Sequence, residues 1–192
     1  MQDPILKREI RNCIDVLRKG GTILYPTDTV WGIGCDATNA KAVQKVFKIK
    51  KRMESKSLIV LLDRKERLSG YISSIPAIAL DLLDSVDTPL TIIYPNAQNL
   101  AKNIIASDGT IAIRLTRFEF CYKLIRMFGK PIVSTSANIS GQSAPLIFKR
   151  ISEEIVNQVD YVVKIGHEEI RKTKPSTIIK LKSNDEFEII RA

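Results

Sequence analysis

The sequence has few of the residues that most often carry catalysis or hold metal ions. It contains one histidine, His167, and three cysteines, Cys13, Cys35 and Cys121, which are widely spaced and form no CxxC pair. An odd number of scattered cysteines argues against a disulfide framework or a zinc site and predicts reduced thiols, as in a cytoplasmic protein. The acidic residues are also scattered, without a glycosidase-like pair or the spacing of metal ligands, so we predict no metal-binding residue.

Long apolar runs and nucleotide-binding glycine motifs are missing too. No uncharged apolar run of about 18 residues is present, so the sequence predicts no membrane span. Residues 25–34 hold hydroxyls and two glycines, Gly32 and Gly34, but lack the third glycine of G-x-G-x-x-G and the G-K-[S/T] of a P-loop. We interpret this segment as a tight turn. An enzyme of this composition would work by positioning and charge neutralisation, as in phosphoryl or nucleotidyl transfer.

Positive charge is what the sequence has in excess, and it is unevenly spread. The formal net charge is +9, and seven basic residues but only one acid, Glu54, stand between Lys41 and Lys56. A charge run of this kind is usually a solvated helix face, but it also suits an anion site for a nucleotide or for RNA. Charge alone leaves both anions open.

Hydrophobic periodicity predicts helices and strands in alternation. Helices are expected after the Asp3-Pro4 start signal and up to Gly20, after an Asn39 cap, and over residues 118–128 and 151–159, with a further helical stretch of about twenty residues through Ile78 and Leu82. Strands are expected at 22–25, 58–62, 90–94, 110–115, from 132 onward, and at 161–165, 176–181 and 187–190. The length fits one domain, residues 1–192, and three late strands with little helix between them predict an α/β sandwich with a mixed sheet.

Two short segments combine charge with hydrogen-bonding side chains. Lys50-Lys51-Arg52 is a cationic cluster at the end of a predicted helix, and Ser134-Thr135-Ser136-Ala137-Asn138 places hydroxyls and an amide at the end of a predicted strand. A concave site made from both would hold a polyanion by charge at one end and by hydrogen bonds at the other. That combination suits a nucleoside triphosphate.

Four segments resemble, in the same order, the motifs of the YrdC family, which comprises the threonylcarbamoyl-AMP synthases. They are residues 21–34, Lys50-Lys51-Arg52, Thr110-Ile111-Ala112-Ile113-Arg114 and residues 134–141. The resemblance covers nearly the whole chain, from residue 20 to residue 191, and the C-terminal extension of longer family members is not present. The chain departs from the family pattern at Met53, where the family has proline, and at Asp87-Thr88-Pro89, where it has Pro-Gly-Pro.

This resemblance implies a fold and an activity. The fold would be a single-domain, three-layer α/β sandwich with a twisted mixed β-sheet and a concave basic cavity. The activity would be that of a nucleotidyltransferase that makes L-threonylcarbamoyladenylate and pyrophosphate from L-threonine, bicarbonate and ATP, with Mg²⁺ accompanying the ATP. The product would serve threonylcarbamoyl modification of the adenosine next to the tRNA anticodon. Contact with tRNA and with a downstream threonylcarbamoyl-transferase complex is expected, without any membrane association.

Matching positions imply the substrate contacts. Lys50 and Arg52 are expected to be the catalytic contacts to the ATP phosphates. The expected ATP-binding residues are Lys50, Arg52, Thr110, Ser136, Asn138, Ala144 and Arg191. The expected threonine-binding residues are Thr27, Arg114, Ser134 and Thr177. Because Thr110 and Arg114 are four residues apart on a predicted strand, both should point to the same side.

A module of a different class is the alternative hypothesis: a non-catalytic protein that binds tRNA or double-stranded RNA in the same basic cavity. Only 6% of the residues are aromatic, and the basic residues are not interleaved with aromatic ones, which disfavours a base-stacking surface. Pyrophosphate release from ATP that depends on both threonine and bicarbonate separates the two hypotheses.

Overall fold

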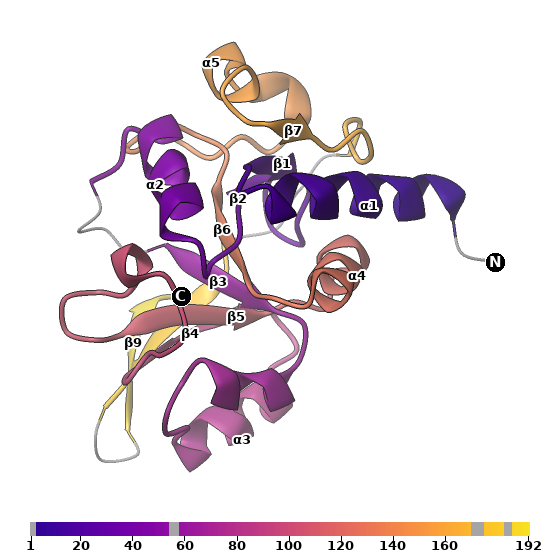
Figure 1. Cartoon of the computed structure of the whole chain (residues 1–192). Coiled ribbons are helices and arrows are strands. Elements are labelled where there is room, and N and C mark those ends of the chain that lie inside the picture. The colour runs from indigo at the N-terminus through magenta and orange to yellow at the C-terminus, as the bar shows by residue number, and fades with distance from the viewer. Residues whose placement is uncertain (1–2, 54–57, 170–174, 183–185) are drawn as a thin grey trace.

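The computed structural model describes residues 3–53, 58–169, 175–182 and 186–192, so Glu54 and Lys56 of the basic run lie outside the described residues (Figure 1). The elements in chain order are α1 (Pro4–Arg18), β1 (Ile23–Tyr25), β2 (Gly32–Gly34), α2 (Ala40–Ile49), β3 (Ile59–Leu62), the 3₁₀ helix η1 (Lys65–Gly70), α3 (Ala77–Ser85), β4 (Leu90–Tyr94), η2 (Lys102–Ile104), β5 (Ile111–Leu115), α4 (Glu119–Phe128), β6 (Ile132–Ser136), η3 (Phe148–Arg150), α5 (Glu153–Val156), β7 (Tyr161–Val162), β8 (Thr177–Leu181) and β9 (Phe187–Arg191).

The strands of the described residues form one mixed sheet in the order β7-β1-β2-β6-β3-β5-β4-β8-β9. Strands β1 and β7, β3 and β5, and β4 and β8 pair in parallel, whereas the other neighbours are antiparallel. The predicted α/β class with a mixed sheet is therefore confirmed. No helix in the described ranges combines the length and the apolar character needed to cross a membrane.

Alternating side chains in the strands divide the interior into two hydrophobic cores. Val60 and Leu62 of β3 belong to the core that α2 and α3 cover, while Leu61 between them belongs to the core under α1 and α4. Figure 1 shows α1 and α4 side by side, away from α2. Because both faces of β3 are buried, its sequence is continuously apolar, as predicted for this strand.

The segment that the sequence predicted to be a tight turn contains strand β2 instead. One of its two glycines, Gly34, is required for strand packing, because a Cβ atom there would collide with the carbonyl oxygen of Val133 and lie 2.8 Å from Cε1 of Tyr25. β2 is antiparallel to both β1 and β6, so its neighbour β6 lies about a hundred residues further along the chain. The residues of the segment itself give no sign of that partner.

Two predicted helices are shorter than expected. The stretch through Ile78 is divided into η1 and α3, because Pro76 stands immediately before α3 and has the extended ψ of 142°. Proline lacks the N–H that a helix interior needs, so it begins a helix and does not continue one. The last helix, α5, spans only Glu153–Val156.

The tight packing of β2 leads to a stability prediction. We expect Gly34→Ala to lower the free energy of unfolding by about 1–3 kcal/mol, because the new methyl group must displace backbone atoms of β6. Gly70→Ala is the control, since a Cβ atom there would meet no atom within 4 Å, and it should change stability by no more than about 1 kcal/mol. Urea denaturation measures both, and equal effects would show that β2 does not need its glycine.

Candidate functional site

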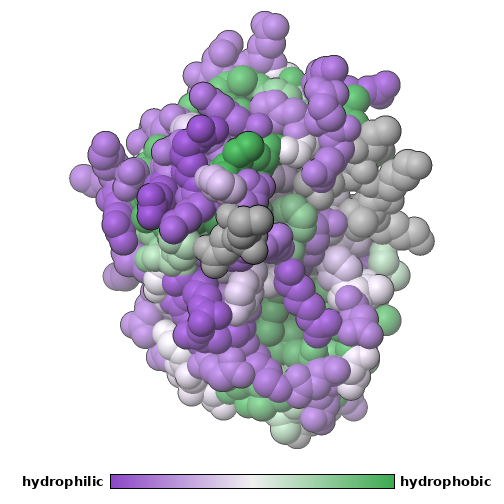
Figure 2. Space-filling view, turned by 90° about the vertical axis from the view of Figure 1, so that its right-hand side faces the viewer, coloured by the Kyte–Doolittle hydropathy of each residue, from purple (hydrophilic) through white to green (hydrophobic). Residues whose placement is uncertain are grey.

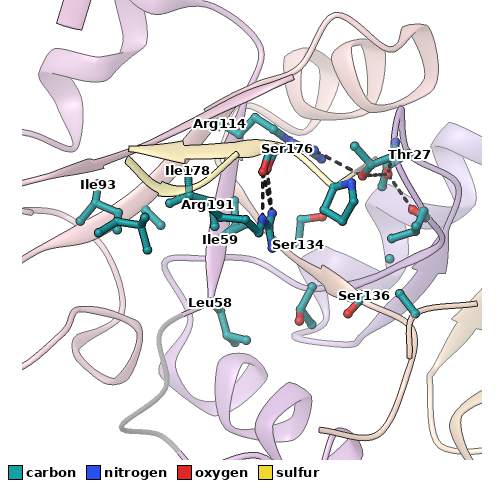
Figure 3. A pocket seen from close by; sticks show the side chains of 18 of the residues that line it. Thr27, Leu58, Ile59, Ile93, Arg114, Ser134, Ser136, Ser176, Ile178 and Arg191 are labelled. Carbon is teal, nitrogen blue, oxygen red and sulfur yellow. Dashed lines mark hydrogen bonds between the residues drawn. The ribbon is translucent and has the colours of Figure 1, made fainter. Parts of the chain in front are cut away.

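A cavity of about 380 Å³ opens on the sheet, and Figure 3 shows its lining from close by. The residues that line it are Thr27, Thr29, Val30, Gly32, Arg52, Leu58, Ile59, Ile93, Ala112, Arg114, Ser134, Thr135, Ser136, Ala144, Pro175, Ser176, Ile178, Ile190 and Arg191. Three arginines are among these residues, and no aspartate or glutamate is among the lining residues that the structure describes. The lining therefore favours an anionic ligand.

Strand register builds the floor of this cavity from two rows of side chains. One row crosses four neighbouring strands through Ser134, Ile59, Ala112 and Ile93, and the next row runs through Arg114, Thr91, Ile178 and Arg191. Ala112 is small and stands between two isoleucines, which leaves space above it. Ile111 and Ile113, on the opposite face of β5, belong to the core under α2 and α3.

Arg114 is a buried cation at one end of the cavity. Its Nη2 lies 3.0 Å from Oδ1 of Asp28, and its Nη1 donates a hydrogen bond of 3.4 Å to Oγ1 of Thr29. Within the described part of the chain, Nε of Arg114 has no hydrogen-bond partner. A buried guanidinium requires a compensating charge, which Asp28 supplies. Figure 3 shows the Arg114 side chain extending toward the segment that carries Thr27.

The turn that carries Thr27 presents backbone and hydroxyl groups to the same end of the cavity. Oγ1 of Thr27 donates to the carbonyl of Val30 at 2.6 Å and accepts from the backbone N–H of Thr29 at 3.1 Å. The hydroxyl therefore fixes the turn that follows β1. Ser134 enters the cavity from β6.

Arg191 stands in the same row of side chains as Arg114, at the sheet edge. Its Nε and Nη2 donate to the carbonyl of Ser176 at 3.1 and 2.7 Å, and Oγ of Ser176 is 2.8 Å from Oγ1 of Thr91. Burial lowers the pKa of Arg191, with a smaller contribution from the charge of Arg114. Arg52 lines the cavity after the end of α2, and burial lowers its pKa also.

The structure brings seven of the eleven predicted site residues into the lining and leaves Lys50, Thr110, Asn138 and Thr177 outside it. The hydroxyl of Thr110 donates to Asp108 at 2.6 Å, before β5 begins, and this hydrogen bond is the main reason that the pKa of Asp108 falls to about 2. Thr177 lies on the face of β8 opposite Ile178, because neighbouring residues of a strand point to opposite sides. The lining residue is its neighbour Ser176, which sequence reasoning missed.

The loop that departs from the family pattern lines a second cavity, of about 200 Å³, which Asp28 also lines. Its walls are mostly apolar, from Leu83, Val86, Pro89, Leu90, Leu115 and Phe118. Figure 2 shows a molecular face that is largely hydrophilic, with hydrophobic residues gathered in a hollow in its lower half. Asp87 and Thr88 belong to this second cavity and are not among the residues that line the first one.

Burial of the Arg114–Asp28 pair leads to a prediction with a matched control. The Arg117–Asp87 pair has the same 3.0 Å separation, but its side chains are 69% and 96% exposed, against 5% and 21% for Arg114 and Asp28. We expect Asp28→Asn to lower the free energy of unfolding by about 2–4 kcal/mol, because a buried cation loses its counter-charge. Asp87→Asn should cost less than about 1 kcal/mol. Chemical denaturation at pH 7 measures both, and equal costs would contradict this role of Asp28.

The comparisons with known proteins agree on one family. The family model Sua5_yciO_yrdC, described as telomere recombination, matches residues 15–192. A threonylcarbamoyl-AMP synthase from Pseudoalteromonas translucida is 37% identical over 174 residues, which cover 88% of this chain and 91% of the relative. A protein of the same name from Vibrio cholerae is 32% identical over 184 residues, covering 91% of this chain and 98% of the relative.

Solved structures resemble the fold closely. P. abyssi Sua5 complexed with L-threonine has a TM-score of 0.82 and 30% sequence identity, over 90% of this chain and 50% of that one. The present chain thus spans half the length of that Sua5 chain. E. coli YciO has a TM-score of 0.84 at 23% identity, over 96% of this chain and 89% of that one, and supports the fold.

Proposed function

Because the chain belongs to the Sua5/YciO/YrdC family, we propose that it is a threonylcarbamoyl-AMP synthase, which makes L-threonylcarbamoyladenylate and pyrophosphate from L-threonine, bicarbonate and ATP. The observation that carries this function is the cavity itself, where Arg114 stands at one end and Arg52 and Arg191 stand elsewhere in the lining. A ligand with an amino-acid carboxylate and a triphosphate would match these charges. The Sua5 structure with L-threonine supports catalysis over the RNA-binding alternative.

The reaction requires two new bonds. The amine nitrogen of threonine bonds to the carbon of bicarbonate, and one water is lost. An oxygen of the resulting carbamate bonds to the α-phosphorus of ATP, whose bond to the bridging oxygen breaks, and pyrophosphate leaves with that electron pair. None of these steps needs a covalent bond to the protein. The chain therefore acts by holding the reactants in line and by neutralising the charge on the leaving pyrophosphate.

At the threonine end, Arg114 holds the substrate carboxylate. Its Nε is a buried donor that no described group accepts, so a ligand oxygen can take it without breaking the contact to Asp28. Thr27 and Ser134 lie on the neighbouring walls, and the hydroxyl of Ser134 offers a short-range hydrogen bond to the amine or hydroxyl of threonine. The hydroxyl of Thr27 is already hydrogen-bonded within its own turn, so Thr27 contributes to threonine binding mainly by positioning the backbone there.

At the nucleotide end, Arg52 and Arg191 neutralise the phosphates, while Ser136 and Ala144 form the wall against which the nucleotide lies. Mg²⁺ comes with the ATP and is bound by its phosphates. No group of three histidine, cysteine or acidic residues that could hold a metal ion occurs in the described ranges. Lys50, Thr110, Asn138 and Thr177 are assigned no contact with substrate.

The product is an acyl-adenylate, so a second protein must pass its threonylcarbamoyl group to an acceptor. We assign that role to a downstream threonylcarbamoyl-transferase complex that modifies the adenosine next to the tRNA anticodon. Direct contact with tRNA is part of this proposal and rests on the net charge of +9.

The cation assignments predict a division between the two substrates. Arg114→Lys keeps the charge beside Asp28 but loses the planar fork, so KM for threonine should rise about tenfold or more while ATP affinity alone is unchanged. Arg52→Ala should weaken ATP binding on the order of 2–4 kcal/mol. Lys51→Gln is the control, because Lys51 pairs with Glu154 at 2.6 Å and lies outside the lining. Pyrophosphate release and calorimetry measure these effects, and loss of ATP affinity in Arg114→Lys would contradict the division.

Amino-acid selectivity tests the threonine end separately. A site that hydrogen-bonds a hydroxyl rejects an analogue without it more strongly than an analogue without a methyl group, because its polar groups stay unpaired. Serine should therefore be a poor but detectable substrate, and valine should be worse than serine. The measurement is pyrophosphate release that depends on bicarbonate and the amino acid. Valine turnover equal to that with threonine would refute the assignment, and no ATP-dependent release with threonine would refute the function.

A further inference from the structure

The Lys50 ammonium is buried and bound entirely to protein oxygens. The residue is 1% exposed, and Nζ lies 2.5 Å from the carbonyl of Ser136, 2.7 Å from the carbonyl of Asn138 and 3.4 Å from Oδ1 of Asn138. An ammonium group has three donors, and these three oxygens occupy all of them. The group is therefore directed at the loop after β6, and its donors are not available to a phosphate.

The Asn138 side chain forms hydrogen bonds within the same loop. Its Nδ2 donates to the carbonyls of Ile139 and Gln142 at 3.0 and 2.6 Å, while its Oδ1 accepts from Lys50. The backbone N–H of Ser140 also donates to the carbonyl of Lys50 at 2.9 Å. Lys50 thus contacts residues 136–142 through both its backbone and its ammonium. We call this set of contacts the Lys50 clamp.

The clamp adjoins residues that form part of the cavity wall. Ser136, at the end of β6, and Ala144, just after the clamped loop, both line the cavity, as does Arg52, two residues after Lys50. The loop is held on its other side where the N–H of Ala137 donates to the carbonyl of Trp31 at 2.9 Å. A shift of residues 136–142 would therefore move the wall formed by Ser136 and Ala144.

We propose that Lys50 is a positioning residue whose ammonium holds residues 136–142 in the shape that presents Ser136 and Ala144 to the nucleotide. Arg52, and not Lys50, makes the phosphate contact. This inference rests on the proposed function in one respect, because it takes the cavity to be the ATP site.

The clamp should depend on pH. Burial, and next the charge of Arg52, lower the pKa of Lys50 to about 8, and residues 136–142 carry no charged side chain. Deprotonation leaves two N–H donors and a lone pair that faces a carbonyl oxygen, so one of the three contacts becomes repulsive. Nucleotide affinity should therefore be full below about pH 8 and fall as the pH rises through that value.

A nucleotide series distinguishes positioning from direct contact. In Lys50→Met, which keeps the length of the side chain but not its charge, Kd for AMP and for ATP should rise by the same factor, about tenfold. In Arg52→Ala, Kd for ATP should rise far more than Kd for AMP, since AMP lacks the outer phosphates. Hydrogen exchange of amides 137–142 should become faster in Lys50→Met and stay unchanged in Arg52→Ala. Asn138→Ala should resemble Lys50→Met, and the double variant should be little worse than either.

A rise in Kd for ATP alone, with unchanged exchange of amides 137–142 in Lys50→Met, would overturn the proposal and make Lys50 a phosphate contact. If Lys50→Met does not fold, the wild-type protein gives the answer: Kd for AMP and for ATP should rise together between about pH 7 and pH 9, and a rise for ATP alone would overturn the proposal. Wild-type protein that binds neither nucleotide would refute the proposed function, while the exchange measurement would still decide whether the clamp exists.

Discussion

The side chains of strand β5 alternate between the two faces of the sheet, and the candidate site depends on this alternation. Ile111 and Ile113 enter the core under α2 and α3, which fixes the strand. Ala112 and Arg114 then necessarily point to the other face, because neighbouring side chains of a strand alternate. On this face of the sheet, α1 and α4 cover other strands, whereas Ala112 and Arg114 of β5 line the cavity. The same side-chain packing that stabilises the sheet therefore places a cation at the end of a hollow.

The two most deeply buried cations near the cavity are stabilised in different ways, and the difference assigns their roles. Arg114 is compensated by a carboxylate on one nitrogen and keeps Nε for a ligand. Lys50 is compensated by neutral oxygens, which use every donor that it has. Burying an ammonium among carbonyl dipoles is costly, and the lowered pKa of Lys50 expresses that cost. Arg114 is thus suited to bind substrate and Lys50 to hold a loop.

Sequence patterns were informative where local residues determine the structure. The apolar run of β3 and the Asn39 cap of α2 were predicted correctly, and motif order led to Arg52, Arg114, Ser136 and Arg191, which the structure gathers in one cavity. The structure differs from these expectations where distant partners or single-residue register matter. The β6 neighbour of β2 is about a hundred residues away. The sequence predicted Thr177 at the cavity, but the residue that lines it is Ser176, one position earlier on the chain. Lys50 and Arg52 are nearly adjacent in sequence, and only the fold directs one inward and the other to the cavity.

In the proposed enzyme, one cavity holds threonine beside Arg114 and ATP toward Arg52 and Arg191. A crystal structure of the protein with L-threonine and a non-hydrolysable ATP analogue tests it most directly. We expect the threonine carboxylate to lie within hydrogen-bond distance of Arg114, the phosphates to contact Arg52 and Arg191, and Lys50 to remain bound to Ser136 and Asn138. Nucleotide outside this cavity, or threonine held away from Arg114, would contradict it.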